Sequence, residues 1–396
     1  MKQVVRKIIK ETHNISDEKP IYTLLLDMNS IMKMSLVDKR LNCDGLEYGM
    51  VYQTLLQIKK QLEKKDFNFV YAFYDGDGSG QLRYNLYNEY KANRDKNYAN
   101  QKSEYDKKID AYCKKVIEYS KNKNKNKEFV RSETEDESFE RQRNIIFACL
   151  EELFCRNLMC DDVEGDDLIA YYVKNKKHNE KIVIVSGDRD LTQLIADDVC
   201  IYITQLKKYI TPSNHIEYIG YTHENVLLKK IMCGDVSDNI KGIKGLGEKT
   251  FFELFPEAKN TKLTIDDIIE KSKKLVEERI KNKKKPLIVT QNIINGITLG
   301  CQGDKFYEIN DKIINLSNPL LTEDAKNELD LMIHAPLDPS GRNIQNLYNI
   351  IKENNITELI EEGKFGEFFS SFYKLIDNEK KNAKKKAGNL LFNKKI

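Results

Sequence analysis

Short hydrophobic runs that lead into an acidic residue are the first pattern along the chain. Residues 21–26 and 67–74 are each followed by an aspartate, and residues 181–185 are followed by Ser-Gly-Asp. Two further runs rich in β-branched and aromatic residues lie at 199–204 and 208–210. Runs of this length and composition predict buried strands.

Segments with helical spacing of apolar residues separate these runs. They lie at 48–64, 144–158 and 166–174. Strands that alternate with helices predict an α/β fold with a mainly parallel sheet. Because ligands bind outside the carboxyl ends of such strands, we expect Asp27, Asp75 and Asp188 to converge if their strands are neighbours.

Composition narrows the class of protein. Of 396 residues, 40% are hydrophobic and 32% are charged, which excludes collagen-like and fully disordered chains. No apolar run approaches the roughly 18 residues of a membrane span, and the start lacks a signal-peptide pattern. We therefore expect a soluble, cytoplasmic protein without a membrane partner. Histidines are few and no cysteine pair has zinc-site spacing, so any chemistry rests on carboxylates.

Positive charge is concentrated in two places, although the net charge is only +3. Residues 91–131 carry a net charge of +7, and residues 379–396 carry +6. Such patches suit a polyanionic partner such as nucleic acid. The alternative is that they are merely solvated helix faces and a soluble tail.

Nine acidic residues stand at strand ends or helix starts. Taken singly, each could cap a helix or close a turn. Gathered together, they would repel one another and raise one another's pKa, and divalent metal is the usual compensation. Ligand sets made only of oxygen favour Mg²⁺ or Mn²⁺, and a two-metal site can hydrolyse a phosphodiester. The nine are Asp27, Asp75, Glu164, Asp166, Asp167, Asp188, Asp190, Asp235 and Asp238.

A basic segment follows the second predicted strand. Arg83, Tyr87 and Lys91 are spaced four apart, which predicts that they share one helix face, and Arg94 follows three residues later. Such a face could hold a phosphate and stack a base. The alternative is an ordinary amphipathic surface helix.

A glycine-rich segment at 242–250 precedes the apolar run FFELF. Closely spaced glycines let backbone amides approach a phosphate, although the spacing is not that of a P-loop. The pattern indicates a helix-hairpin-helix type turn, which contacts duplex backbone without reading base sequence. The candidate contacts are Gly242, Gly245, Gly247, Lys249 and Thr250.

Five blocks together resemble the 5′-nuclease (flap endonuclease) superfamily, most closely phage ribonuclease H and the 5′-nuclease domain of bacterial DNA polymerase I. They are LLLDMNS, FYDGDGSGQLRYNLYNEYKANR, DVEGDDLIAYYV, IVIVSGDRDLTQL and CGDVSDNIKGIKGLGEKT, in the family's order over residues 21–256. The resemblance implies a PIN-like α/β core with a mainly parallel sheet flanked by helices, a helix–three-turn–helix DNA clamp and a helical C-terminal region.

The resemblance also implies roles for individual residues. The acids around a first metal are matched by Asp27, Asp75, Glu164, Asp166 and Asp188. Those around a second metal are matched by Asp190, Asp235 and Asp238. Asp167 matches a position between the two groups. Arg83 and Lys91 match basic residues that contact the scissile phosphate. Together with Asp166 and Asp188 they are the expected catalytic residues. Tyr87 and Tyr90 match positions where a base could stack. Two Mg²⁺ ions, replaceable by Mn²⁺, are implied, with K⁺ at the helix–three-turn–helix.

The expected domains follow from these matches. Residues 1–20 form an N-terminal extension. Residues 21–230 form the PIN-like catalytic domain, in which 95–131 is a basic arch or bridge over the active site. Residues 231–378 form the helix–three-turn–helix and helical DNA-binding region. Residues 379–396 form a basic tail that includes the short apolar cluster GNLLF.

The expected function is that of a structure-specific, Mg-dependent 5′→3′ exonuclease and flap endonuclease that removes RNA primers and 5′ flaps during replication. Its partners would be DNA with 5′ flaps or ends and RNA–DNA hybrids, bound by a monomer, with a sliding clamp or single-strand binding protein docking on the tail. The style of the motifs suggests a phage or other viral replication protein. Two alternatives stay open: a PIN-type single-strand ribonuclease, and a non-catalytic structure-specific DNA-binding protein.

Overall fold

The computed structural model describes residues 19–93, 133–298, 304–335, 337, 339–361 and 363–381. Most of the N-terminal extension, Arg94, the 95–131 insertion and nearly all of the basic tail therefore lie outside the described residues. No helix in these ranges is long and apolar enough to cross a membrane.

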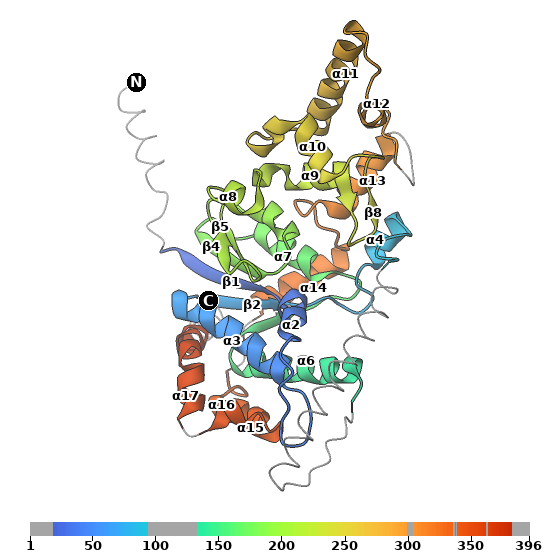
Figure 1. Cartoon of the computed structure of the whole chain (residues 1–396). Coiled ribbons are helices and arrows are strands. Elements are labelled where there is room, and N and C mark those ends of the chain that lie inside the picture. Colours follow the sequence, from blue (N-terminus) through green and yellow to red (C-terminus); the bar gives the residue numbers. More distant parts are fainter. Residues whose placement is uncertain are drawn as a thin grey trace, which may run out of the picture.

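A six-stranded sheet forms the centre of the molecule, in the order β3-β2-β1-β4-β5-β6 (Figure 1). Every neighbouring pair is parallel except β5 and β6. The strands are β1 (Ile21–Asp27), β2 (Phe69–Phe73), β3 (Arg156–Leu158), β4 (Glu180–Ser186), β5 (Val199–Ile203) and β6 (Lys208–Ile210). The predicted mainly parallel sheet is confirmed, and β1 lies between β2 and β4, as convergence of their aspartates requires.

The sequence pattern did not predict strand β3. The predicted helix at 144–158 is observed as α6 (Glu135–Glu152), which is followed by a turn and then by β3. The prediction was wrong at its end because a three-residue strand is too short to show the twofold alternation. Phe154, with a positive φ of 63°, lies in the turn between the two elements.

Alternation along the strands sends apolar side chains to both faces of the sheet. In β1, Leu24 and Leu26 belong to one core, whereas Leu25 belongs to the other. Successive residues of a strand point to opposite faces, so a continuous apolar run is buried on both sides. The first core lies under α2 (Met28–Ser35), α3 (Gly49–Lys64) and α6. The second lies under α7 (Gly165–Lys174), η1 (Asp190–Leu194) and α14 (Glu323–His334).

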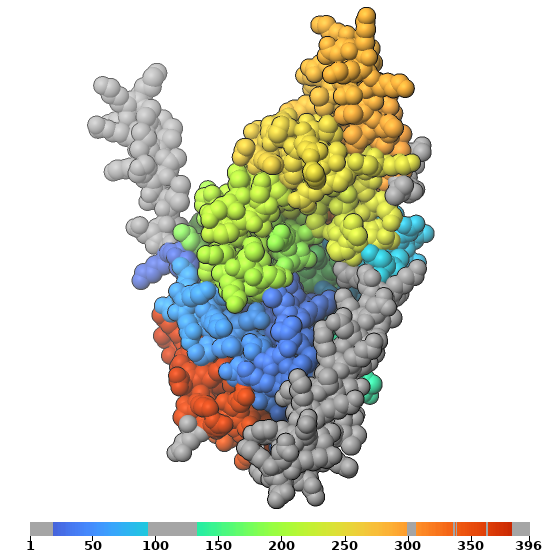
Figure 2. Space-filling view, in the orientation of Figure 1, coloured from blue at the N-terminus to red at the C-terminus, as the bar shows by residue number. Residues whose placement is uncertain are grey.

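A third hydrophobic core forms a separate lobe beside the sheet. Figure 2 shows this lobe, yellow to gold, rising at one end of the molecule. It is built from α9 (Val226–Cys233), α10 (Glu248–Leu254), η3 (Pro256–Lys259), α11 (Ile265–Lys281), α12 (Ile288–Ile294) and α13 (Asp304–Ile314), with the ribbon β7 (Gly234–Asp235) and β8 (Ile240–Lys241).

The predicted helical region 231–378 divides between cores. Its first part, to Ile314, belongs to the third core, but α14 returns to the sheet. The last helices pack on the first core through Leu347, Phe369 and Phe372. They are α15 (Ile344–Glu353), α16 (Thr357–Ile360), α17 (Lys364–Phe369) and η4 (Ser370–Phe372). The remaining short helices are α4 (Gln81–Leu86), α8 (His215–Ile219) and η2 (His223–Asn225).

Candidate metal centre

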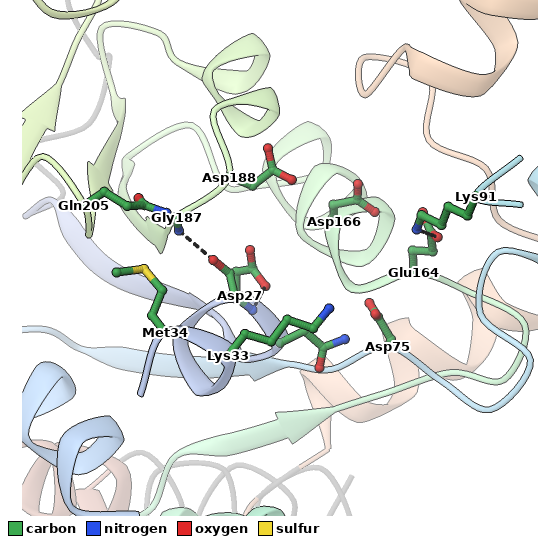
Figure 3. Close-up of a pocket in the computed structure, with 12 residues that line it drawn as sticks. Asp27, Lys33, Met34, Asp75, Lys91, Glu164, Asp166, Gly187, Asp188 and Gln205 are labelled. Atoms are coloured by element: carbon green, nitrogen blue, oxygen red, sulfur yellow. Dashed lines mark hydrogen bonds and ion pairs between the residues drawn. The ribbon is translucent and has the colours of Figure 1, made fainter. Parts of the chain in front are cut away.

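A pocket of about 390 Å³ opens at the carboxyl ends of the central strands. Figure 3 shows Asp27, Asp75, Asp166 and Asp188 facing a common space, with Glu164 at its side. β1 ends in Asp27, Asp75 lies two residues beyond β2, and Asp188 lies two residues beyond β4. The sheet topology has therefore brought together the three strand-end aspartates, as the sequence predicted.

The remaining two acids of the pocket come from the start of α7. Glu164 is its N-cap residue and Asp166 lies in its first turn. A backbone hydrogen bond from the Gly165 N–H to Asp75 Oδ1 (2.7 Å) attaches this helix start to the end of β2. The five acids of the first predicted group thus line one pocket, although 139 residues separate Asp27 from Asp166 in the sequence.

Burial changes the acidity of these carboxyl groups. It raises the pKa of Asp27 to about 6, although hydrogen bonds from Ser186 and Ser30 act in the opposite direction. It also raises the pKa of Asp166 well above its usual range, and the neighbouring charges of Asp167 and Glu164 add to the effect. Crowded carboxyl groups of this kind bind a divalent cation because it relieves their repulsion.

Cations of the chain itself neutralise Glu164. Arg83 Nη1 lies 2.9 Å from Glu164 Oε2, and Lys91 Nζ pairs with the other oxygen. The Tyr90 hydroxyl donates to the same carboxylate at 3.0 Å. Burial alone would raise the pKa of Glu164, but Arg83 and Lys91 lower it below its ordinary value. The cations of the chain itself thus favour the charged form of Glu164.

Asp167 lies behind the pocket rather than in its lining. One of its oxygens accepts from Arg83 Nη2 (3.1 Å) and from the Leu320 N–H (2.9 Å), and the other pairs with Arg83 Nη1. One oxygen each of Glu164, Asp166 and Asp167 nevertheless lie within 4.8 Å of one another. These contacts favour Asp167 as the anchor of Arg83 over a direct role with metal, which stays a prediction.

Two of the three acids in the second predicted group pair with a lysine that sequence reasoning missed. Lys230 of α9 pairs with both Asp190 and Asp235, at 2.5 Å from Asp235 Oδ2. Asp238 receives a longer contact of 3.4 Å from the Tyr90 hydroxyl. Burial would raise the pKa of Asp235, but Lys230 and Ser237 lower it to about 2. Burial and then the charge of Asp188 raise the pKa of Asp190 to about 7, against the effect of Lys230.

The prediction that Arg83, Tyr87 and Lys91 share one helix face is wrong. Helix α4 ends at Leu86, and Lys91 has a φ of +57°, which no α-helix contains. Tertiary contacts override the local pattern here. The Lys91 N–H donates to the Asp238 carbonyl at 2.8 Å, and Tyr90 is buried in the third core.

The basic residues consequently differ in position. Lys91 lines the pocket, whereas Arg83 is buried and donates through Nε to the Ile313 carbonyl at 2.9 Å. Tyr90 is also buried, so only Tyr87, whose hydroxyl donates to Glu89 at 3.1 Å, remains a candidate for base stacking. Lys33 of α2, which the sequence analysis did not select, also lines the pocket, and its side chain extends toward Asp75 (Figure 3). The sequence feature that could have identified Lys33 is a cationic residue on the helix that directly follows Asp27.

The glycine-rich segment lies between β8 and α10 on the third lobe. Gly245 (φ +86°), Gly247 and Lys249 are exposed, and Thr250 is half-buried. Gly242 meets a different requirement, because an added Cβ would lie 2.1 Å from the Cys233 backbone. Gly242 therefore permits the close approach of β7 and β8, and the exposed backbone lies at Gly245 and Gly247.

An open, mostly parallel sheet with an acidic pocket at its switch point places the chain among resolvase-like and PIN-like α/β proteins. The chain belongs to the 5′–3′ exonuclease, N-terminal resolvase-like domain family, which it matches over residues 23–220, half of its length.

Relatives agree with this assignment. The chain is 36% identical over 141 residues to the 5′–3′ exonuclease of Buchnera aphidicola, covering 35% of this chain and 48% of that protein. It is 31% identical over 143 residues to DNA polymerase I of Bacillus subtilis, covering 35% of this chain and 16% of that protein. The match thus spans less than half of the length of these relatives.

The fold is also similar to that of solved structures. The T5 5′-exonuclease with bound zinc superposes with a TM-score of 0.52 at 18% identity, covering 84% of this chain and 98% of that one. A bacteriophage T5 flap endonuclease in a pseudo-enzyme–product complex with DNA and metal ions gives a TM-score of 0.53 at 18% identity, covering 84% and 97%. These likenesses confirm the predicted fold.

Proposed function

We propose that the protein is a metal-dependent 5′ nuclease, a structure-specific 5′→3′ exonuclease and flap endonuclease that removes RNA primers and 5′ flaps during replication. One observation carries the proposal: five carboxylates from four separate segments line a single pocket at the switch point of the sheet. Neighbouring carboxylates repel one another, and a purely structural role would not explain why so many of them lie together.

The residues fit divalent metal of the Mg²⁺ type. The acids offer only oxygen donors, and among the residues that the structure describes no cysteine or histidine lines the pocket. A first ion would be held by Asp27, Asp75, Glu164, Asp166 and Asp188. A second ion would be held by Asp190, Asp235 and Asp238. Bound Mg²⁺ or Mn²⁺ supplies a lowered pKa for water and charge stabilisation at the leaving oxygen of a phosphodiester.

The chain's own residues would position the substrate. Lys91 and Lys33 present ammonium groups at the pocket, where they can hold the scissile phosphate. The exposed backbone at Gly245 and Gly247, with Lys249, would contact the duplex backbone, and K⁺ could bridge that turn to a phosphate. Contacts of this kind bind without sequence preference and weaken steeply with salt.

The test uses the full chain with a 5′-labelled flap duplex and a matched RNA–DNA hybrid, in Mg²⁺ and in EDTA. We expect metal-dependent release of short 5′ products, whose sizes separate exonuclease from flap cutting. Tight binding without cleavage in Mg²⁺ or Mn²⁺ would instead establish the non-catalytic DNA-binding alternative. Preferential cleavage of free single-stranded RNA would establish the ribonuclease alternative.

Replacing Lys91 by alanine should lower the cleavage rate of bound flap substrate by about 100-fold, the effect of losing one donor to a developing charge. The fold should persist because Arg83 still pairs with Glu164. Single-turnover cleavage and a binding titration in Ca²⁺ measure the two effects separately.

Lys364→Ala is the matched control, since Lys364 of α17 is an exposed lysine paired with Glu361 and lies outside the pocket lining. It should cleave like the unchanged protein. A Lys91→Ala variant whose loss lies entirely in affinity would contradict a role at the scissile phosphate.

A further inference from the structure

Lys230 joins two of the three acids of the second group, Asp190 and Asp235. Its ammonium lies 2.5 Å from Asp235 Oδ2 and also pairs with Asp190. The side chain of Lys230 is only 13% exposed. The other oxygen of Asp235 accepts from the Ser237 N–H (2.8 Å) and hydroxyl (2.6 Å). The oxygens of Asp190 and Asp235 that face each other therefore share one internal cation.

The first group has a different arrangement. Among the described residues, lysine and arginine pair with Glu164 at one side of the pocket, but none forms an ion pair with Asp75, Asp166 or Asp188. The carboxylates in the middle of that pocket thus form no direct ion pair, although the ammonium groups of Lys33 and Lys91 also line it. A divalent cation entering there meets carboxyl groups that hold no ion-pair partner, whereas one entering at Asp190 and Asp235 meets Lys230 first.

We propose that Lys230 is a built-in competitor for the second metal position, so that divalent ions load in order: the first into the pocket, the second only after the ammonium of Lys230 has left Asp190 and Asp235. This inference rests on the proposed function, because it concerns the same metal centre.

The chemistry of lysine suits this exchange. An ammonium carries one charge on a flexible four-carbon stem, so it can compensate two carboxylates and still move away. A divalent ion needs the same oxygens and carries twice the charge, so the two cations exclude each other. Occupancy of the second position is therefore set by competition, and the second ion binds more weakly than the acids alone would allow.

The experiment counts the ions bound to the whole 396-residue chain without DNA. Mn²⁺ binding is followed by isothermal titration calorimetry and by electron paramagnetic resonance of free Mn²⁺, in the unchanged protein and in Lys230→Met. We expect one tighter and one weaker ion in the unchanged protein. In Lys230→Met the second ion should bind about tenfold tighter or more, while the first changes little.

Lys229→Met is the matched control. Lys229 is the adjacent residue on α9 but pairs with Glu248 at 3.0 Å, so this variant removes the same charge without freeing Asp190 or Asp235. It should bind both ions as the unchanged protein does. An unchanged or weakened second ion in Lys230→Met would overturn the inference. Failure to bind any ion in either protein would instead refute the proposed metal centre itself.

A second measurement needs no variant. Acylation of lysine amines, read by peptide mass spectrometry, should be slow at Lys230 in the metal-free protein and should increase as the second ion loads. Lys229 serves as the internal reference. Protection of Lys230 that does not change with Mn²⁺ would show that the ammonium stays in place, contrary to the inference.

Discussion

Replacing Asp188 by asparagine is expected to lower cleavage by about a thousand-fold and to leave DNA binding intact. Asp188 stands where the two groups of acids meet, since it lines the pocket and its Oδ1 accepts the Asp190 N–H at 2.8 Å. Its own N–H donates to Ser186 at 2.8 Å, and the Ser186 hydroxyl donates to Asp27. Asparagine keeps this shape but removes the negative charge that a divalent cation requires.

DNA affinity should persist in Asp188→Asn because it depends on cations that meet phosphates, and losing one negative charge cannot weaken that attraction. Single-turnover cleavage of a flap duplex in Mg²⁺ and a binding titration measure the two properties. Asp197→Asn, an exposed acid that lines no part of the acidic pocket, is the control and should be fully active. Cleavage by Asp188→Asn at the normal rate would refute the assignment of the site.

Replacing Arg83 by methionine should destabilise the protein by about 3–5 kcal/mol, the usual cost of leaving a buried charge without its partner. Arg83 and Asp167 are 6% and 1% exposed in their side chains. Arg83 also joins α4 and α7 to the end of α13 through the Ile313 carbonyl. Its position therefore indicates a stabilising role at least as large as the role at the phosphate that the resemblance implies.

Thermal unfolding in EDTA measures this effect without any contribution from metal. Arg143→Met removes a half-buried arginine that pairs with the exposed Glu140 at 3.1 Å and should cost less than about 1 kcal/mol. The double variant Arg83→Met with Asp167→Leu should recover most of the loss, because it removes the charge of Asp167 together with its partner, and Glu164 keeps its pair with Lys91. An Arg83→Met protein as stable as Arg143→Met would argue against the buried pair.

The predicted strands and the convergence of their aspartates were accessible from the sequence because they depend on local patterns. A strand that is buried on both faces appears in the sequence as a continuous apolar run. The parallel arrangement follows because these runs alternate with helical segments. Asp27, Asp75 and Asp188 could then be placed at one edge of the sheet without knowing any side-chain contact. The acids at the start of α7 were recognised from the apolar helical run that follows them, and the family motifs matched them to metal sites.

The basic segment after β2 shows where local reasoning fails. Spacing of four residues predicts a helix only if no stronger contact competes. Here Tyr90 packs in the third core, and the Lys91 N–H donates to the carbonyl of Asp238. Because these contacts are incompatible with a longer helix, α4 ends at Leu86. The burial of Arg83 was equally invisible, because its partner Asp167 is 84 residues away.

By itself the sequence determined five of the six strands of the sheet, that the sheet is mainly parallel, and which strand-end aspartates lie beside one another at its edge. The tertiary structure alone decided that Lys230 pairs with Asp190 and Asp235, that Arg83 is buried against Asp167, and that α15 to α17 return to cover the first core. The reason is physical: a local pattern encodes whether a side chain is buried, but its partner is chosen by packing between segments that are distant along the chain.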